Sequence, residues 1–329
     1  LGTQVSKKIG ASKNLIINGA FQVAQRGTSS TTTGYQTVDR FSNEHSGVDE
    51  APTQAQVSIA SGDTPYTLGF KNAYKITNGN QTSGAGAADL ILISHRIEAQ
   101  DIANSGWNFK SASSFITLSF WVRSSVAQEF HGFLLTNDGT QKHYSFSLGS
   151  LSANTWTKVT KIIPGDSTLD FDNDNGEGLL IRIALFQGTN KTGTITQNQW
   201  ANFNSSVRYP NYTSTWYTTN DATFEITGVQ LEVGSVATDF EHKTFAEDLL
   251  LCERYYQLVK SGPGKTAADN QYAFRVGLSP TMRATPSVLL LDGSNAYDEI
   301  WVGTRTVTSA GTYRGDASSI GISGNMSGG

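Results

Sequence analysis

The chain has 329 residues, a length that suits two domains or one large sandwich with an appendage. Charged residues make up only 16% of the sequence, the formal net charge is -4, and no stretch concentrates Lys or Arg, so we expect no nucleic-acid partner. Hydrophobic residues make up 37%, and Gly, Ser, Thr and Asn fill much of the rest, which favours short strands joined by polar turns over a helical bundle.

Residues 1–13 are predicted to form an N-terminal extension. They lack the charged-then-apolar pattern of a signal peptide, and the chain starts at Leu1 rather than Met. We therefore expect a processed or trimmed end, or the middle of a longer polypeptide. No stretch of about 18 apolar residues follows, so membrane insertion is not expected.

Several segments within residues 14–243 alternate apolar and polar positions with period two, as half-buried strands do. Two of them are Leu179–Phe186 and Tyr144–Leu148. A third is Ser114–Ser124, in which one face holds Ile116, Leu118, Phe120 and Val122, and the other holds Thr117, Ser119, Trp121 and Arg123. These segments predict a sheet with one apolar face.

One further segment changes phase. Phe224 and Ile226 alternate, Val229 and Leu231 alternate in the opposite phase, and Gly228 at the slip predicts a β-bulge. Turn signals separate the strands: Asn18-Gly19, Asn78-Gly79, Asp138-Gly139, Pro164-Gly165-Asp166 and Asn175-Gly176. The predicted fold class is therefore all-β, an antiparallel jelly roll or β-sandwich over residues 14–243.

Residues 244–260 are predicted to be a connecting helix. Thr244 and Glu247 have the spacing of a capping box. An apolar stripe follows at i, i+4, i+7 and i+11, made of Phe245, Leu249, Cys252 and Tyr256. The helix should run from about Phe245 to Leu258, with the thiol of the single cysteine, Cys252, buried on that stripe.

Residues 261–329 are predicted to form a second, smaller β domain. Strand patterns resume at Tyr272–Leu278, Ser287–Leu291 and Glu299–Val307. The Gly/Ser-rich end, Ser323–Gly329, stops without a capping element, so we expect this domain to be incomplete or to continue in the natural protein.

The sequence carries no motif that selects a catalytic site. The five histidines form no zinc-binding spacing and have no neighbouring cysteine; they are His45, His95, His131, His143 and His242. No phosphate-binding loop, dinucleotide glycine pattern or nucleophile elbow occurs where a strand meets a helix. A pair of catalytic carboxylates stays open, because such residues can lie far apart in sequence. We expect a protein that is not an enzyme and has no cofactor other than a candidate calcium ion.

That candidate comes from a Gly-rich turn. Asp170, Asp172 and Asp174 sit at alternate positions, and three hard oxygen ligands close together suit Ca²⁺. The turn lacks the Gly and the distant bidentate Glu of an EF-hand, so a solvated turn before the strand at Leu179 is the alternative.

Aromatic residues crowd the polar segment Gln197–Asn220. Flat rings stack on the apolar faces of sugars, and neighbouring Asn and Gln side chains bind hydroxyl groups. The candidate glycan-binding residues are Trp200, Tyr209, Tyr212, Trp216 and Tyr217. The alternative is that these rings pack the rim of the sandwich or a contact between subunits.

Three parts of the chain carry a family resemblance. They are Asn14–Gly27 with Val38–Phe41, Ser119–Ser124 with Asp174–Leu179, and Ile226–His242 running into Leu251–Tyr256. Together they resemble bacteriophage tail-fibre and head-fibre proteins whose jelly roll is similar to carbohydrate-binding modules. The resemblance implies an exposed, trimeric virion protein. Related jelly rolls hold calcium with an acidic residue after an N-G-x-F turn, a position that Gln22 occupies here.

These features predict a tail-fibre or adhesin subunit that is made in the host cytoplasm and works on the virion surface. It would form a homotrimer, contact other virion tail or capsid proteins, and attach to host surface polysaccharide. The alternative is a capsid (head) fibre or decoration protein with a purely structural role. A glycan depolymerase would need a groove with paired carboxylates, and no residues point to one.

Overall fold

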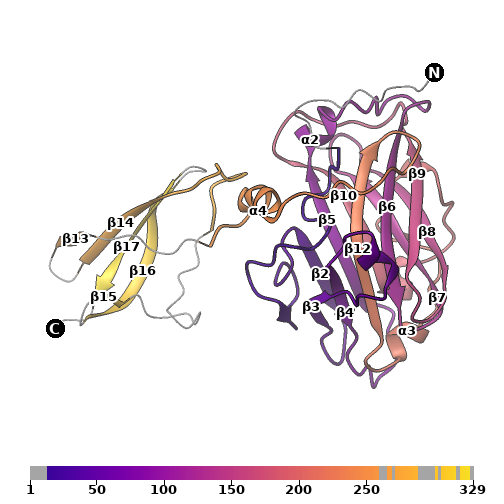
Figure 1. The fold of residues 1–329 in the computed structure, drawn as a ribbon, viewed down its shortest axis with the longest axis horizontal. Coiled ribbons are helices and arrows are strands. Elements are labelled where there is room, and N and C mark those ends of the chain that lie inside the picture. The colour runs from indigo at the N-terminus through magenta and orange to yellow at the C-terminus, as the bar shows by residue number, and fades with distance from the viewer. Residues whose placement is uncertain are drawn as a thin grey trace. The chain divides into compact units, whose positions relative to one another are not determined.

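In the computed structural model the described residues are 13–258, 265–268, 271–287, 301–302, 305–315 and 319–326, with side chains described in 13–258 and 277–287. The chain divides into two compact units, Leu1–Asp248 and Leu249–Gly329 (Figure 1). The division falls inside the segment that the sequence predicts to be a connecting helix.

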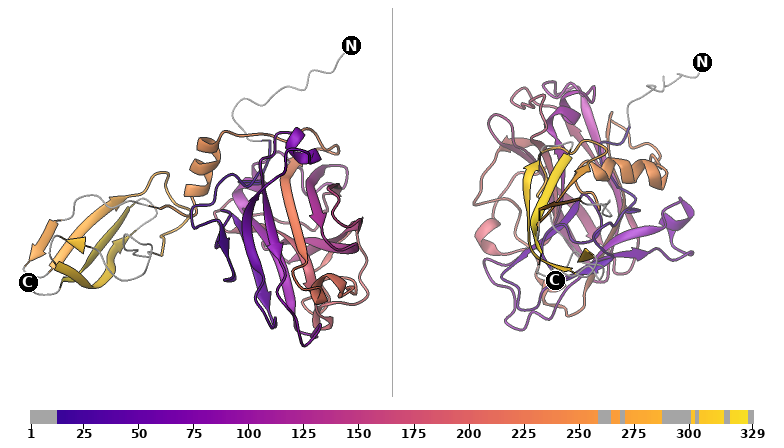
Figure 2. Two further views of the ribbon diagram at one scale, coloured as in Figure 1. Left: turned by 60° about the horizontal axis from the view of Figure 1, so that its bottom comes forward. Right: turned by 90° about the vertical axis from the view of Figure 1, so that its left-hand side faces the viewer.

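Unit 1 is a sandwich of two antiparallel sheets with six strands each (Figures 1 and 2). The first sheet has the order β1 (Ser29–Ser30), β3 (Thr53–Ser58), β4 (Asn72–Thr77), β12 (Thr223–Val233), β6 (Phe115–Ser124), β9 (Thr157–Pro164). The second has the order β11 (Trp200–Asn202), β8 (Lys142–Leu151), β7 (Gln128–Thr136), β10 (Glu177–Gln187), β5 (Leu90–Glu98), β2 (Phe41–Ser46). The predicted all-β class and antiparallel sandwich are confirmed.

Short helical turns lie in the connections of unit 1. They are α1 (Thr64–Thr67), α2 (Ala99–Ala103), the 3-10 turn η1 (Thr189–Lys191) and α3 (Thr215–Thr218). Across the described part of the chain, no helix has the length and apolar character needed to cross a membrane.

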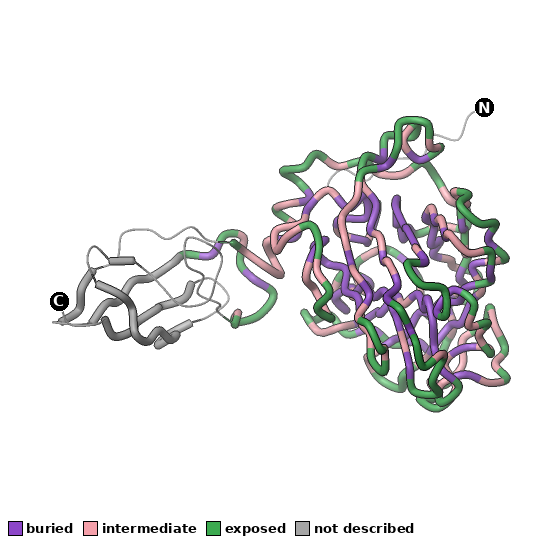
Figure 3. Tube along the Cα trace, turned by 90° about the horizontal axis from the view of Figure 1, so that it is seen from below, coloured by how far each residue is buried: buried purple, intermediate pink, exposed green. Residues whose placement is uncertain are grey.

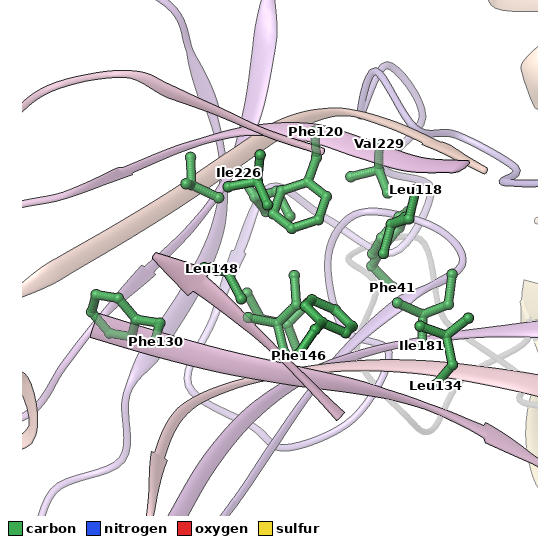
Figure 4. Packing of buried hydrophobic residues seen from close by; sticks show 14 of the residues in the cluster. Phe41, Leu118, Phe120, Phe130, Leu134, Phe146, Leu148, Ile181, Ile226 and Val229 are labelled. Atoms are coloured by element: carbon green, nitrogen blue, oxygen red, sulfur yellow. The ribbon is translucent and has the colours of Figure 1, made fainter. Parts of the chain in front are cut away.

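The core lies between the two sheets and follows the predicted alternation. Ile116, Leu118, Phe120 and Val122 of β6 are all fully buried. Figure 4 shows side chains from the two sheets facing one another: Leu118, Phe120, Ile226 and Val229 on one side, and Phe130, Leu134, Phe146 and Ile181 on the other. Buried positions accordingly run along the strands, and exposed positions gather in the loops (Figure 3).

The predicted bulge at Gly228 is confirmed. The register between β12 and β6 shifts between Thr227 and Gln230, and Gly228 has a φ of 64°. A methyl group on Gly228 would come within 2.6 Å of Cζ of Phe70. The extra residue lets Ile226 and Val229 both point into the core despite their opposite phase.

The two ends of the sandwich meet beside β12. The side-chain amide of Asn14 donates to the carbonyl of Val229 (3.0 Å), and its oxygen accepts from the backbone N–H of Leu231 (3.0 Å). The carboxylate of Glu241 accepts from the backbone N–H groups of Lys13 (3.1 Å) and Asn14 (2.9 Å). We call these contacts the terminal clasp.

The connecting helix α4 (Phe245–Glu253) begins as predicted and ends early. Its capping box forms, because the backbone N–H of Thr244 donates to Glu247 (2.8 Å) and that of Glu247 donates to the Thr244 hydroxyl (3.3 Å). Cys252 is buried, as predicted. The predicted end near Leu258 is wrong, and Phe245 is 54% exposed rather than buried on the stripe.

Unit 2 contains a five-stranded antiparallel sheet. Its order is β13 (Lys265–Ala268), β14 (Gln271–Gly277), β17 (Ser319–Met326), β16 (Arg305–Gly315), β15 (Trp301–Val302). The predicted strand Tyr272–Leu278 matches β14, and Glu299–Val307 spans β15 and the start of β16. The predicted strand Ser287–Leu291 lies outside the described residues, except for Ser287, which is in no strand.

Candidate functional site

Residues 188–214, which we call the covering segment, contain the edge strand β11 and bring Tyr209, Phe203 and Tyr212 onto the outer face of the second sheet. Tyr209 has no exposed surface and lies 5.2 Å from the ring of Phe133. The buried cluster beneath the segment consists of Leu92, Phe133, Leu135, Leu180, Ala184 and Tyr209. The prediction that Tyr209 lies on a glycan surface is therefore wrong, because its ring offers no face to a ligand.

Trp216 and Tyr217 of α3 are also fully buried. The indole N–H of Trp216 donates to the carbonyl of Thr223 (3.1 Å). The hydroxyl of Tyr217 donates to Asp89 (2.9 Å), and its ring stacks on Phe186 at 4.2 Å. These two residues are part of the core, so the packing alternative holds for them and the glycan prediction does not.

Trp200 and Tyr212 are partly buried and hold the chain onto the sheet. The indole N–H of Trp200 donates to the carbonyl of Pro164 (2.7 Å). The hydroxyl of Tyr212 donates to the carbonyl of Ala184 (2.9 Å) and accepts from the backbone N–H of His131 (3.1 Å). Their polar atoms already have protein partners, which assigns both residues to packing.

The three aspartates of the predicted calcium site are exposed, and the pKa of Asp138 is raised by burial and by the negative charges of all three. Asp170 pairs with Lys110 (3.3 Å), and Asp174 accepts from the backbone N–H of Gly176 (2.8 Å). The backbone N–H of Asp172 donates to Asp138 (3.1 Å). Within the described ranges, no group of three or more His, Cys, Asp or Glu side chains is placed to hold a metal ion, so the structure contradicts the predicted site.

Gln22 fills the position where the resembling jelly rolls carry an acidic calcium ligand. Its side-chain N–H group donates to the carbonyl of Lys243 (3.2 Å) and to the carboxylate of Asp248 (3.2 Å). Burial raises the pKa of the Asp248 carboxyl. An amide donor thus takes the place in which the resemblance would put an oxygen ligand.

A second group of aromatic side chains lies on the outer face of the first sheet. Side chains alternate between the two faces of a strand, and the apolar side chains of β6 point into the core. Trp121 and Arg123 of the same strand therefore point outward. Trp121 is the cross-strand partner of Lys158 on β9, and Arg123 is the partner of Glu225 on β12. Trp156 precedes β9 directly. We call Trp121, Arg123, Trp156 and Lys158 the aromatic face.

Arg123 is fixed at the centre of this face. Its Nε donates to Glu225 (2.7 Å) and its Nη1 donates to Asp63 (3.1 Å). Its Cζ lies 4.8 Å from the ring centre of Trp156, which is cation–π geometry. The guanidinium group therefore covers one face of Trp156 and is itself held by two carboxylates.

The indole N–H groups distinguish the two kinds of tryptophan. Those of Trp107, Trp200 and Trp216 donate to main-chain carbonyls. Among the described residues, none accepts a hydrogen bond from Trp121, and the covered N–H of Trp156 also lacks a partner. Both rings are partly buried against a small apolar cluster that includes Phe70. Since buried indoles usually find an acceptor, Trp121 is the side chain best suited to an outside ligand.

Sequence reasoning placed Trp121 on the polar face of its strand without selecting it as a site. The signal was present, because a tryptophan at the polar phase of an alternating strand places a large ring on the solvent side. Trp156 had no such signal, since it stands outside the strand and meets Arg123 only through the pairing of β6 with β9.

No protein-family model and no curated protein matches the chain. Among solved structures, the enzymatically active domain of bacteriophage CBA120 tailspike protein 4 aligns at 10% identity with a TM-score of 0.35, covering 68% of this chain and 22% of that one. A sugar-binding protein of Bacteroides thetaiotaomicron, named as putative, aligns at 14% identity and a TM-score of 0.34, covering 67% and 100%.

The N-terminal cellulose-binding domain of Cellulomonas fimi β-1,4-glucanase C aligns at 11% identity and a TM-score of 0.31, covering 66% of this chain and 99% of that domain. This chain spans less than a quarter of the tailspike chain that it matches. At these identities and scores, the likenesses carry no argument about the ligand of this chain, and the aromatic face stands on its own geometry.

Proposed function

We propose that unit 1 is a glycan-binding module and that the aromatic face of the first sheet is its binding surface. The observation that carries the proposal is Trp121, a partly exposed indole on a sheet face whose N–H has no acceptor among the described residues. An aromatic ring gives an apolar platform for a sugar ring, and the N–H provides one directional hydrogen bond to a hydroxyl.

We further propose that the chain is a subunit of a virion tail fibre or adhesin, works on the virion surface as a homotrimer, and contacts other virion proteins. This part rests on the sequence resemblance of residues 14–258 to phage fibre proteins. A glycan-binding surface on such a subunit would attach the particle to the polysaccharide of its host.

The test is binding of the purified protein to a glycan array, followed by titration of the best glycan. Trp121→Ala should weaken binding at least about tenfold, a loss of about 1.4 kcal/mol, because it removes the stacking platform. Trp200→Ala is the matched control, because it deletes a partly buried tryptophan whose N–H is bound within the protein. Equal binding by the Trp121→Ala variant and the wild type would contradict the proposal.

One observation favours the structural alternative of a capsid fibre or decoration protein. The exposed large apolar side chains of unit 1 include Val236 at 69% and Phe245 at 54%, and exposed apolar groups of this kind often lie in protein interfaces. Locating the chain in an intact virion separates the alternatives. A capsid position together with an array that shows no bound glycan would favour the structural role.

A further inference from the structure

We infer that the aromatic face prefers anionic glycans, those with carboxylate or phosphate groups, over neutral ones. This inference rests on the proposed function and adds the chemical class of the ligand. The inference is based on the cations near Trp121. One of them already has acidic partners among the described residues, and two do not.

Arg123 is not available to an anionic ligand. Glu225 and Asp63 occupy its Nε and Nη1, and Trp156 covers its plane. Its role is to neutralise the two carboxylates and to hold Trp156 in place. The acidic side chains at this face therefore do not repel an anion as free carboxylates would.

Two lysines flank Trp121 without acidic partners. Lys158 is exposed and stands directly across from Trp121, on the neighbouring strand β9. Lys75 is half-buried on β4 and pairs in register with Glu225, whose carboxylate is held by Arg123. Neither lysine forms an ion pair with any residue in the described part of the chain.

The strand order sets the spacing of these charges. Lys75 on β4 and Lys158 on β9 are separated by β12 and β6, with Trp121 between them. Three inter-strand steps place the two backbone positions about 14 Å apart across the sheet. Lys75 lies in register with Arg123 and Lys158 with Trp121, so the two lysines border the aromatic face on opposite sides.

The local charge contrasts with the rest of the protein. At this face three cations, Lys75, Arg123 and Lys158, stand beside two carboxylates, Asp63 and Glu225. The whole chain carries a net charge of -4. An anionic polysaccharide is therefore favoured at this face relative to the average surface of the molecule.

The experiment compares neutral polysaccharides (dextran, mannan, laminarin) with anionic ones (polygalacturonate, alginate, a phosphorylated mannan) on the array and in titrations at low and high salt. The double variant Lys75→Gln/Lys158→Gln should bind anionic glycans about tenfold more weakly at low salt, and high salt should remove this difference. The control Lys110→Gln/Lys142→Gln makes the same change in net charge at lysines whose partners, Asp170 and Asn202, lie elsewhere.

Each outcome is decisive. Selective, salt-sensitive binding of anionic glycans that the lysine pair controls would support the inference. Binding of neutral glycans that depends on Trp121 but not on the lysines would overturn the inference and leave the proposed function standing. Failure to bind any glycan, or binding that Trp121→Ala leaves intact, would overturn the proposed function itself.

Discussion

The outer faces of the two sheets both carry aromatic side chains, and these have different structural roles. On the second sheet, the covering segment brings Tyr209 into a buried cluster, and the hydroxyl of Tyr212 forms hydrogen bonds with main-chain groups. On the first sheet, nothing in the described chain takes the N–H of Trp121. In this chain, crowding of aromatic residues in sequence marks packing, whereas a polar atom without a partner on a partly exposed ring indicates a surface open to a ligand.

The largest effect is expected at Trp216, a core residue that serves as the packing reference for this comparison. Replacing it with Ala should lower the free energy of unfolding by about 3–5 kcal/mol, because a fully buried ring and its hydrogen bond to Thr223 are lost. Chemical denaturation of both variants gives the comparison with Trp121→Ala, which removes only a partly buried ring. Similar losses for the two variants would show that Trp121 is itself a packing residue, which would break the distinction between packed rings and the partly exposed ring.

An intermediate effect is expected at Gly228. Gly228→Ala should cost about 1–3 kcal/mol, because the new methyl group meets Phe70, which lies in the apolar cluster under Trp121. Glycan binding should also weaken in the Gly228→Ala variant, because a shift of Phe70 would move Trp121.

The matched control is Gly149→Ala in β8, which also has a positive φ (88°) but has open space around the added methyl group. It reports backbone strain alone. Equal losses of stability and binding in the two variants would show that contact with Phe70 plays no part.

The smallest expected effect is that the attachment of the covering segment to the second sheet depends on pH. Burial lowers the pKa of both His131 and His143 below the ordinary value of 6.5, and Glu129 only partly offsets this for His131. These rings contact Tyr212 (5.2 Å) and Phe203 (5.9 Å). When the covering segment detaches, the imidazoles bind protons more readily, so its attachment should be lost progressively as the pH falls below 6.5.

Hydrogen exchange of residues 188–214, corrected for intrinsic rates and compared between about pH 7 and pH 5, measures this effect. Protection should fall there more than in β6 and β12, and His131→Gln should reduce the difference. A uniform change over both sheets would argue against a local cause.

Much of the fold could be predicted from local patterns. Period-two alternation identified the inward residues of β6, the phase change located the bulge at Gly228, and Thr244 with Glu247 gave the start of α4. Each of these signals lies within a short stretch of consecutive residues and depends on local periodicity, turn or capping geometry.

The candidate site could not be predicted in the same way, because it depends on pairing between distant segments. Arg123 meets Trp156 and Glu225 only through the register of β6 with β9 and β12. The covering segment is held at the second sheet because β11 pairs with β8, a contact between residues more than fifty positions apart. The early end of α4 is a different case, because it is marked by a local turn in which the backbone N–H groups of Tyr255 and Tyr256 both donate to the carbonyl of Cys252.

The terminal clasp has a mechanical consequence. A pull on the two ends of the sandwich acts first on the hydrogen bonds that join Asn14 with Val229 and Leu231, and on the one that Lys13 donates to Glu241, because these contacts join the ends directly. Tension would load these few hydrogen bonds before it shears the strands of the sheets. A module tethered at both ends would therefore lengthen under load while its aromatic face keeps its shape.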